Sequence, residues 1–280
     1  MLYIIGNKRL SVAVDSLGAE LNSVKKDGKE LLWQNYDGSW DGHAPVLFPF
    51  CGHSAVIIDG KDYNAPAHGI VQQCEFSCTL QTGNELVLTF NSNAETKKIY
   101  PYDFSFSVRY YVRTTTLYIN YTVKNTGNKV MFFGCGGHES FNIDAKLERY
   151  SIEFEKEENL LRLYHNDGGY LTGESKLYPK SKFLRFKDMP VDNSETLIFK
   201  GVKSNWCRLI KDAGETVAET HFKGFNNLLF WRPDGASMIC MEPWTNLPDI
   251  ENDSTDFCKK YGIKPLEAGA EKVIRRKIIY

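Results

Sequence analysis

The stretch that decides the fold is residues 104–123, which reads FSFSVRYYVRTTTLYINYTV. In its first half, apolar and aromatic side chains alternate with more polar ones, at Phe104, Phe106, Val108, Tyr110 and Val112. The second half repeats the pattern at Leu117, Ile119, Tyr121 and Val123. A period of two places each set on one face of an extended strand. The two halves, joined by residues 113–116, therefore predict an antiparallel hairpin with one buried face.

Similar short segments lie on both sides of this hairpin and extend over the whole chain. Glycine, asparagine and aspartate separate them, as in the turn expected at residues 125–128. A helical pattern is confined to residues 253–261, where we expect one short helix or turn. The apolar or alternating segments are residues 10–14, 21–24, 85–90, 182–186, 196–199, 206–210, 227–231 and 273–279. Because no repeat or linker divides the series, the sequence predicts one all-β domain over residues 1–280, with two large antiparallel sheets packed face to face.

The balance of charges limits the partners of this chain. It has 34 lysines and arginines against 35 aspartates and glutamates, with a formal net charge of −1. Nucleic acid binding requires clustered basic residues, so nucleic acid is not expected, whereas a neutral or weakly charged small molecule is. No apolar run reaches the roughly 18 residues of a membrane span, and Met1–Gly6 does not resemble a signal peptide. We expect no membrane partner and a cytoplasmic protein, either monomeric or homodimeric.

The cysteines and acidic residues suggest no metal site. The seven cysteines are odd in number and lack a Cys-x-x-Cys pair, which predicts buried free thiols. The sequence has no His-x-His, no His-Glu-x-x-His and no close cluster of several cysteines and histidines, so no metal is expected. Residues 249–256 contain four carboxylates without the glycine spacing of a calcium loop, which predicts a solvated acidic loop.

Polar, titratable residues interrupt the apolar pattern first at residues 43–53 and again at His68-Gly69. A histidine has a pKa of about 6.5, which suits proton transfer, but a lone histidine such as His43 or His53 is more often a structural loop residue than a catalytic one. His68 differs from these two because Gly69 permits a tight turn that presents the ring.

Two further segments contain candidate acid–base residues. In residues 134–142 (GCGGHESFN), the double glycine can aim His138 into a cleft, although an exposed histidine on a plain turn is the alternative. In residues 238–244 (MICMEPW), Glu242 follows four apolar residues, and Pro243 is expected to end the strand there. Burial would raise the pKa of this carboxyl and make it a better base, whereas the alternative is a strand-end glutamate that reaches solvent. Trp244 offers an aromatic face on which a sugar can stack.

These segments resemble the aldose 1-epimerase (galactose mutarotase) superfamily, and especially its LacX-like branch. Four blocks match in order: residues 44–52 (APVLFPFCG), 68–69 (HG), 136–142 (GGHESFN) and 239–244 (ICMEPW). Asp249 and residues 260–266 (KYGIKPL) follow them. Together the blocks span nearly the whole chain.

The resemblance implies a β-supersandwich of the galactose mutarotase type and a cofactor-free isomerase that interconverts the α and β anomers of a free aldose. It implies that Glu242 takes the proton from the anomeric hydroxyl and that His138 protonates the ring oxygen, while His68 assists by hydrogen bonding. Trp244 and Asn142 are expected to contact the sugar.

Three positions depart from the family pattern. His53 and Gln72 stand where arginines are usual, and Glu195 takes the place of a substrate-binding aspartate. All three are expected at the substrate, with altered specificity because histidine cannot copy the planar fork of arginine. The alternative is a carbohydrate-binding or regulatory module that keeps the cleft with weak or no catalysis. An epimerase for phosphorylated hexoses and a glycosidase that uses Asp249 or Glu195 as a second carboxylate are the remaining alternatives.

Overall fold

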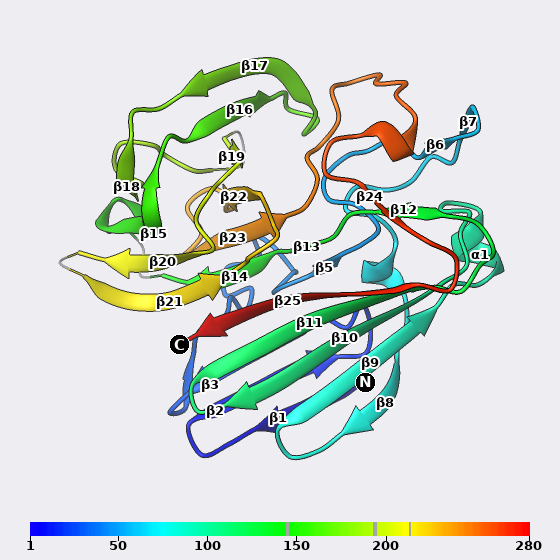
Figure 1. Cartoon of the computed structure of the whole chain (residues 1–280). Helices are drawn as coiled ribbons and strands as arrows, with labels where there is room; N and C mark the ends of the chain where they lie inside the picture. The colour runs from blue at the N-terminus through cyan, green and yellow to red at the C-terminus, as the bar shows by residue number, and fades with distance from the viewer. Residues whose placement is uncertain (144–145, 193–194, 213) are drawn as a thin grey trace.

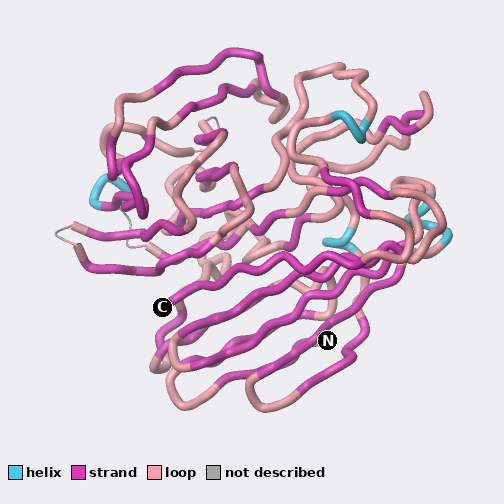
Figure 2. Tube along the Cα trace, viewed as in Figure 1, coloured by secondary structure: helices cyan, strands magenta, loops and turns pink. Residues whose placement is uncertain are grey.

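The computed structural model describes residues 1–143, 146–192, 195–212 and 214–280. Strands dominate it, and helix is confined, in these ranges, to short segments (Figure 2). They are α1 (Ala94–Lys97) and the 3-10 turns Val71–Gln73, Leu147–Arg149 and Phe257–Lys259. The predicted all-β architecture is confirmed, and the last of these turns lies within the predicted helical segment 253–261. None of the described helices has the length and apolarity of a membrane span.

The larger of two extended sheets contains the predicted hairpin at its centre (Figure 1). Its strands, in spatial order, are β18 (Ser181–Arg185), β15 (Tyr150–Glu158), β20 (Trp206–Lys211), β21 (Glu215–His221), β25 (Glu271–Ile279), β11 (Thr116–Asn125), β10 (Phe104–Arg113), β9 (Glu85–Asn91) and β8 (Ser77–Gln81). Val112 pairs with Leu117, as the alternation requires, and the turn uses Thr114 with a positive φ of 53°.

The second extended sheet carries the polar segments. Its strands, in order, are β17 (Leu171–Leu177), β16 (Leu161–His165), β19 (Leu197–Lys200), β22 (Asn227–Trp231), β23 (Met238–Trp244), β13 (Gly136–Gly137) and β5 (Val46–Leu47), with β14 (Glu139–Asn142) also paired to β23. Neighbouring strands in both extended sheets run antiparallel.

Three smaller sheets complete the structure. A four-stranded sheet consists of β1 (Leu2–Gly6), β2 (Leu10–Asp15), β3 (Leu21–Lys26) and β4 (Lys29–Glu30), and two strand pairs are β6 (Ile57–Ile58) with β7 (Lys61–Asp62) and β12 (Met131–Phe133) with β24 (Lys264–Leu266). One apolar core, which contains residues of both extended sheets and of the four-stranded sheet, joins these elements.

A buried ion pair connects the two extended sheets. Arg276 of β25 contacts Glu139 of β14, and their side chains are 0% and 3% exposed. The guanidinium occupies the space beside Gly137, where even a Cβ atom would collide with it. Burial by itself would lower the pKa of Arg276, but the Glu139 carboxylate raises it above the ordinary value, so the arginine stays charged. The missing side chain of Gly137 therefore allows β25 to lie close beneath β13 and β14, as Figure 1 shows.

We predict that Arg276→Met destabilises the fold strongly, because it leaves the buried Glu139 carboxylate without its partner. The expected loss is about 3–5 kcal/mol in the free energy of unfolding, measured by urea denaturation at neutral pH. Arg9→Met is the control, since Arg9 makes an exposed pair with Asp27 and should unfold like the wild type. A loss below about 1 kcal/mol for Arg276→Met would contradict the structural role of the pair.

Candidate functional site

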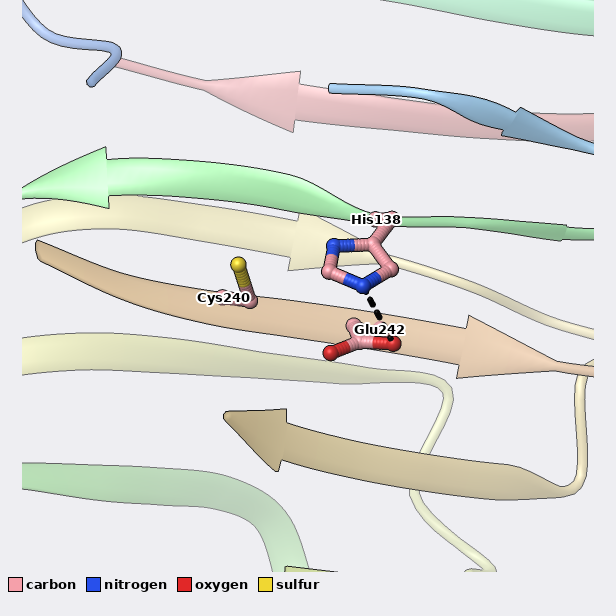
Figure 3. Close-up of side chains that lie close together, drawn as sticks. All are labelled: His138, Cys240 and Glu242. Carbon is pink, nitrogen blue, oxygen red and sulfur yellow. Dashed lines mark ion pairs between the residues drawn. The ribbon is translucent and has the colours of Figure 1, made fainter. Parts of the chain in front are cut away.

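The pairing of β14 with β23 places His138 opposite Glu242. Glu139 pairs with Met241. One step back along β14 reaches His138, and one step forward along β23 reaches Glu242. The Nε2 atom of His138 lies 3.3 Å from Oε2 of Glu242 (Figure 3). Both residues are buried, at 8% and 2% exposed, so the exposed-turn reading of His138 and the solvent-reaching reading of Glu242 are both wrong.

β23 does not end at Glu242 as expected. It continues through Pro243 to Trp244, because Leu228 of β22 pairs with Pro243 and Gly136 of β13 pairs with Trp244. The extended backbone accommodates the fixed φ of proline while both neighbouring strands keep their register. As a result, Glu242 and Trp244 project from the same face of β23.

This face of the sheet forms the floor of a cavity of about 380 Å³. The register continues the row from Glu242 to Leu229 on β22 and Ile198 on β19. The cavity is lined by Trp40, Gly52, His53, His68, His138, His165, Asp167, Gly169, Thr196, Ile198, Leu229, Trp231, Glu242, Trp244 and Pro248. Its volume lies within the range typical of small-ligand pockets.

Aromatic rings form much of the wall around His138. Trp40 stacks on the imidazole with ring centroids 5.3 Å apart, and Trp231 meets it edge-on at 5.9 Å. Trp244 lies edge-on to His68 at 5.3 Å. Flat aromatic faces beside a few polar groups suit a sugar, which presents C–H bonds on its faces and hydroxyls at its edges.

His68 enters the cavity from a strained turn. Its φ is +65°, and Gly69 follows at +83° with its Cα packed against the Phe48 carbonyl, where no side chain fits. The Gly52 N–H donates to Nδ1 of His68 at 3.1 Å. Since Nδ1 is an acceptor, the neutral ring carries its proton on Nε2. His68 is thus fixed as a hydrogen-bond donor, with its ring 5.7 Å from that of His138.

Burial shifts the titration of all three candidate acid–base groups. The pKa of Glu242 is raised well above its usual value by burial and then by the nearby Glu139 carboxylate. Burial, followed by the proximity of His68, lowers the pKa of His138 to about 3. Burial, followed by the proximity of His53, lowers the pKa of His68 to about 4. These pKa shifts favour the state of the Glu242–His138 pair in which the shared proton resides on the carboxyl group and the imidazole is neutral.

The structure brings five of the eight expected site residues to this cavity: Glu242, His138, His68, His53 and Trp244. His53 stacks on Tyr170 at the rim, with ring centroids 4.7 Å apart. Of the described residues that line the cavity, none is a lysine or an arginine.

The other three expected residues lie outside the cavity lining. Gln72 belongs to the 3-10 turn Val71–Gln73 and borders a separate surface cavity with Gly69 and Lys98. Glu195 forms an ion pair with Arg162. The side-chain amide of Asn142 donates to the Leu32 carbonyl at 2.7 Å and so ties β14 to a neighbouring loop. The placement of these three side chains gives no support to the predicted substrate contacts.

Sequence reasoning missed part of the lining, including Trp40, His165, Asp167, Thr196 and Trp231. The predicted strand at residues 227–231 contains Trp231, so its face could have been inferred from the register. Nothing in the pattern pointed to the β16–β17 turn that contains Asp167. There, the Thr196 N–H donates to Nε2 of His165 at 3.0 Å, so Nδ1 holds the proton and donates to the Asn166 carbonyl at 2.8 Å. His165 thereby fixes the turn at the rim of the cavity.

The acidic loop is less solvated than predicted. Asp249 is buried, forms an ion pair with Lys260 and accepts a hydrogen bond from the Ala55 N–H at 2.8 Å. Its own N–H donates to the His53 carbonyl at 2.8 Å. Asp249 can be buried because Lys260 neutralises its carboxylate. Its hydrogen bonds to Ala55 and His53 then hold the loop that contains His53 in place.

One set of potential metal ligands coincides with the acid–base pair. Ligand atoms of His138, Cys240 and Glu242 all lie within 4.8 Å of one another. These residues are far apart or unremarkably spaced in the sequence, so spacing alone could not reveal the cluster. Within the described residues, the seven cysteines form no disulfide.

Comparisons with known proteins agree with this geometry. A family model described as aldose 1-epimerase matches residues 1–257. The chromosomal LacX protein of Lactococcus lactis subsp. lactis is 31% identical in an alignment of 273 residues that covers 88% of this chain and 88% of that protein. A galactose mutarotase related enzyme from Lactobacillus acidophilus is 27% identical, with a TM-score of 0.92 over 100% of this chain and 97% of the other. A galactose mutarotase-like protein from Lactobacillus casei is 26% identical, with a TM-score of 0.93 over 100% and 99%. The galactose mutarotase-like fold expected from the sequence is confirmed.

We predict that the His68 ring stays neutral at pH 6 and titrates with a midpoint of about 4, because burial disfavours the imidazolium. Between this midpoint and pH 6, ¹⁵N NMR of the His68 imidazole should report the neutral tautomer protonated at Nε2. His68→Gln assigns the signal. A midpoint at the ordinary value of about 6.5 would mean that the cavity is far wetter than the structure implies.

Proposed function

The chain belongs to the aldose 1-epimerase family, and we propose that it interconverts the α and β anomers of a free aldose. The observation that carries this proposal is the buried Glu242–His138 pair on the floor of a cavity with aromatic walls. An acid and a base that lie 3.3 Å apart can serve two oxygens bonded to the same carbon. In a pyranose these oxygens are O1 and O5, both attached to C1.

In the proposed reaction, the proton of the pair first moves from Oε2 of Glu242 to Nε2 of His138. The carboxylate then takes the proton from the O1 hydroxyl, the C1–O5 bond breaks, and the imidazolium delivers its proton to O5. The open chain rotates about C1–C2, and the same groups act in reverse to close the ring on the other face of the carbonyl. Protons are conserved within the pair and the sugar, so the cycle requires no external proton and no cofactor.

His68 and the tryptophans would orient the sugar. The Nε2–H of His68 would donate to a sugar oxygen next to the reacting carbon, because its ring lies 5.7 Å from that of His138. Trp40, Trp231 and Trp244 would hold the faces of the ring, and this positioning supplies part of the rate enhancement.

We predict that the wild type accelerates the mutarotation of freshly dissolved α-glucose or α-galactose, measured by polarimetry. Glu242→Gln and His138→Asn should each lower kcat at least about 100-fold, since each removes one proton-transfer group. Glu174→Gln, an exposed change on β17, is the matched control and should keep the full rate. Wild-type rates equal to those of the two site variants would remove the enzymatic proposal.

We further predict that free hexoses bind better than hexose 6-phosphates. The described lining of the cavity contains carboxylates but no lysine or arginine, and a phosphate dianion requires such donors. Inhibition of mutarotation by each sugar provides the comparison. Tighter binding of the phosphate esters would contradict a preference for neutral sugars.

The alternative, a sugar-binding module with weak or no catalysis, derives from His53 at a rim position where the family usually has arginine. It predicts that sugars raise the Tm of the wild type while the mutarotation rate stays at that of Glu242→Gln. Polarimetry and thermal unfolding of the same samples therefore separate the two functions.

A further inference from the structure

Sheet geometry places a thiol behind the acid–base pair. Cys240 and Glu242 are two residues apart on β23, so their side chains project from the same face. His138 lies opposite Glu242, and Ser140 pairs with Cys240. Figure 3 shows the Cys240 sulfur, the His138 ring and the Glu242 carboxyl gathered on one side of the strands. One ligand atom from each of the three residues lies within 4.8 Å of the other two.

The three donors form the kind of set that binds zinc. Zn²⁺ takes thiolate sulfur at about 2.3 Å, imidazole nitrogen at about 2.0–2.1 Å and carboxylate oxygen at about 2.0–2.2 Å in tetrahedral geometry. These lengths place the ligand atoms roughly 3.3–3.7 Å from one another. The pair His138 Nε2 and Glu242 Oε2 already has this separation at 3.3 Å. The Cys240 sulfur lies within 4.8 Å of a ligand atom of each of the other two residues.

A second observation points to a ligand at this position. The other ring nitrogen of His138, Nδ1, is buried and has no hydrogen-bond partner among the described residues. Buried polar atoms in native proteins usually have a partner, and one without a partner indicates a missing ligand, ion or water. His138 therefore has an unused ring nitrogen as well as the Nε2 atom that lies beside the Glu242 carboxyl.

The surroundings of the three residues differ, and they indicate how an ion would reach the site. Cys240 packs with Trp33 and Met238, under Trp40 and Trp231, and does not line the cavity. His138 and Glu242 do line it. The cavity therefore gives an ion access to two of the three ligand residues.

We propose that His138, Cys240 and Glu242 form a binding site for a thiophilic divalent ion of the zinc type, and that the bound ion inhibits the enzyme by occupying its acid–base pair. The binding step stands on geometry alone, whereas the inhibition rests on the proposed function. Magnesium and calcium prefer all-oxygen ligand sets and are not expected at a site with a thiolate.

The binding experiment uses Co²⁺ as a spectroscopic probe on the full chain, reduced, under anaerobic conditions and without sugar. We expect one equivalent of Co²⁺ to produce a sulfur-to-cobalt charge-transfer band with the visible bands of a four-coordinate ion. Zn²⁺ should displace the cobalt and abolish both signals. A wild type without the charge-transfer band would overturn the proposal.

Variants identify the ligands. Cys240→Ser should lose the charge-transfer band. Glu242→Gln should keep the band but bind Co²⁺ at least roughly 10–100-fold more weakly, since the loss of a mere hydrogen-bond partner of a metal ligand already has an effect of this size. Cys207→Ser, which changes a buried thiol on β20 of the other extended sheet, is the matched control and should bind like the wild type. A band that persists in Cys240→Ser would overturn the assignment. Thermal unfolding without metal establishes that each variant is folded. If Cys240→Ser does not fold, the loss of Co²⁺ affinity in Glu242→Gln still tests the site.

The inhibition experiment measures mutarotation at increasing Zn²⁺. The wild type should lose activity as the site fills, and Cys240→Ser should require at least about 10-fold more zinc for half-inhibition. High sugar should protect the wild type. If the wild type catalyses no mutarotation even without zinc, the proposed function is wrong. The cobalt experiment still tests the metal site, because it does not depend on catalysis. Catalysis that zinc inhibits equally in both proteins would overturn the inhibitory site alone.

Discussion

The register between β14 and β23 is the constraint on which the site depends. Successive residues of this strand face opposite sides: His138 projects into the cavity, whereas Glu139 and the side-chain position of Gly137 face Arg276 on the other side. A shift of one residue would exchange the two sets and place His138 against the arginine of the other sheet. The ion pair of Glu139 with Arg276 and the absence of a side chain at Gly137 favour the native register, since a Cβ atom at residue 137 would collide with the guanidinium.

The same arrangement links the core to the electrostatics of the cavity. A buried pair of charges is costly to desolvate and adds little net stability compared with apolar packing, so its position matters more than its strength. Here the Glu139 carboxylate lies one residue along the strand from the His138 backbone, and its charge adds to the burial that raises the pKa of Glu242. A residue on the hidden face of the sheet therefore influences the protonation of a group on the open face.

Much of the architecture followed from local patterns. Alternation at residues 104–123 predicted the central hairpin and its pairing, and the match of four sequence blocks predicted the family and the fold. The cavity required information that no local pattern contains. Gln72, Glu195 and Asn142 were expected at the substrate from the family resemblance, yet a turn, an ion pair and a backbone hydrogen bond hold them outside the cavity lining. Conversely, Trp40 and Asp167 reach the cavity from loops, whose course depends on tertiary contacts.

The strand through Pro243 illustrates the same limit at a smaller scale. A proline is a reasonable indication of a strand end when a sequence is read alone, but pairing on both sides carries β23 two residues beyond Glu242. The second of these residues is Trp244, and with it the sheet contributes an aromatic ring to the cavity beside the carboxyl group.

The tryptophan walls give the cavity an optical property. Of the five indoles in the chain, those of Trp40, Trp231 and Trp244 border this one space, and Trp40 lies flat against an imidazole whose charge state would alter its emission. Three of the five tryptophans that contribute to the intrinsic fluorescence of this 280-residue protein therefore lie at the cavity. Occupancy of the cavity can be followed in real time, by stopped-flow mixing, without any attached dye.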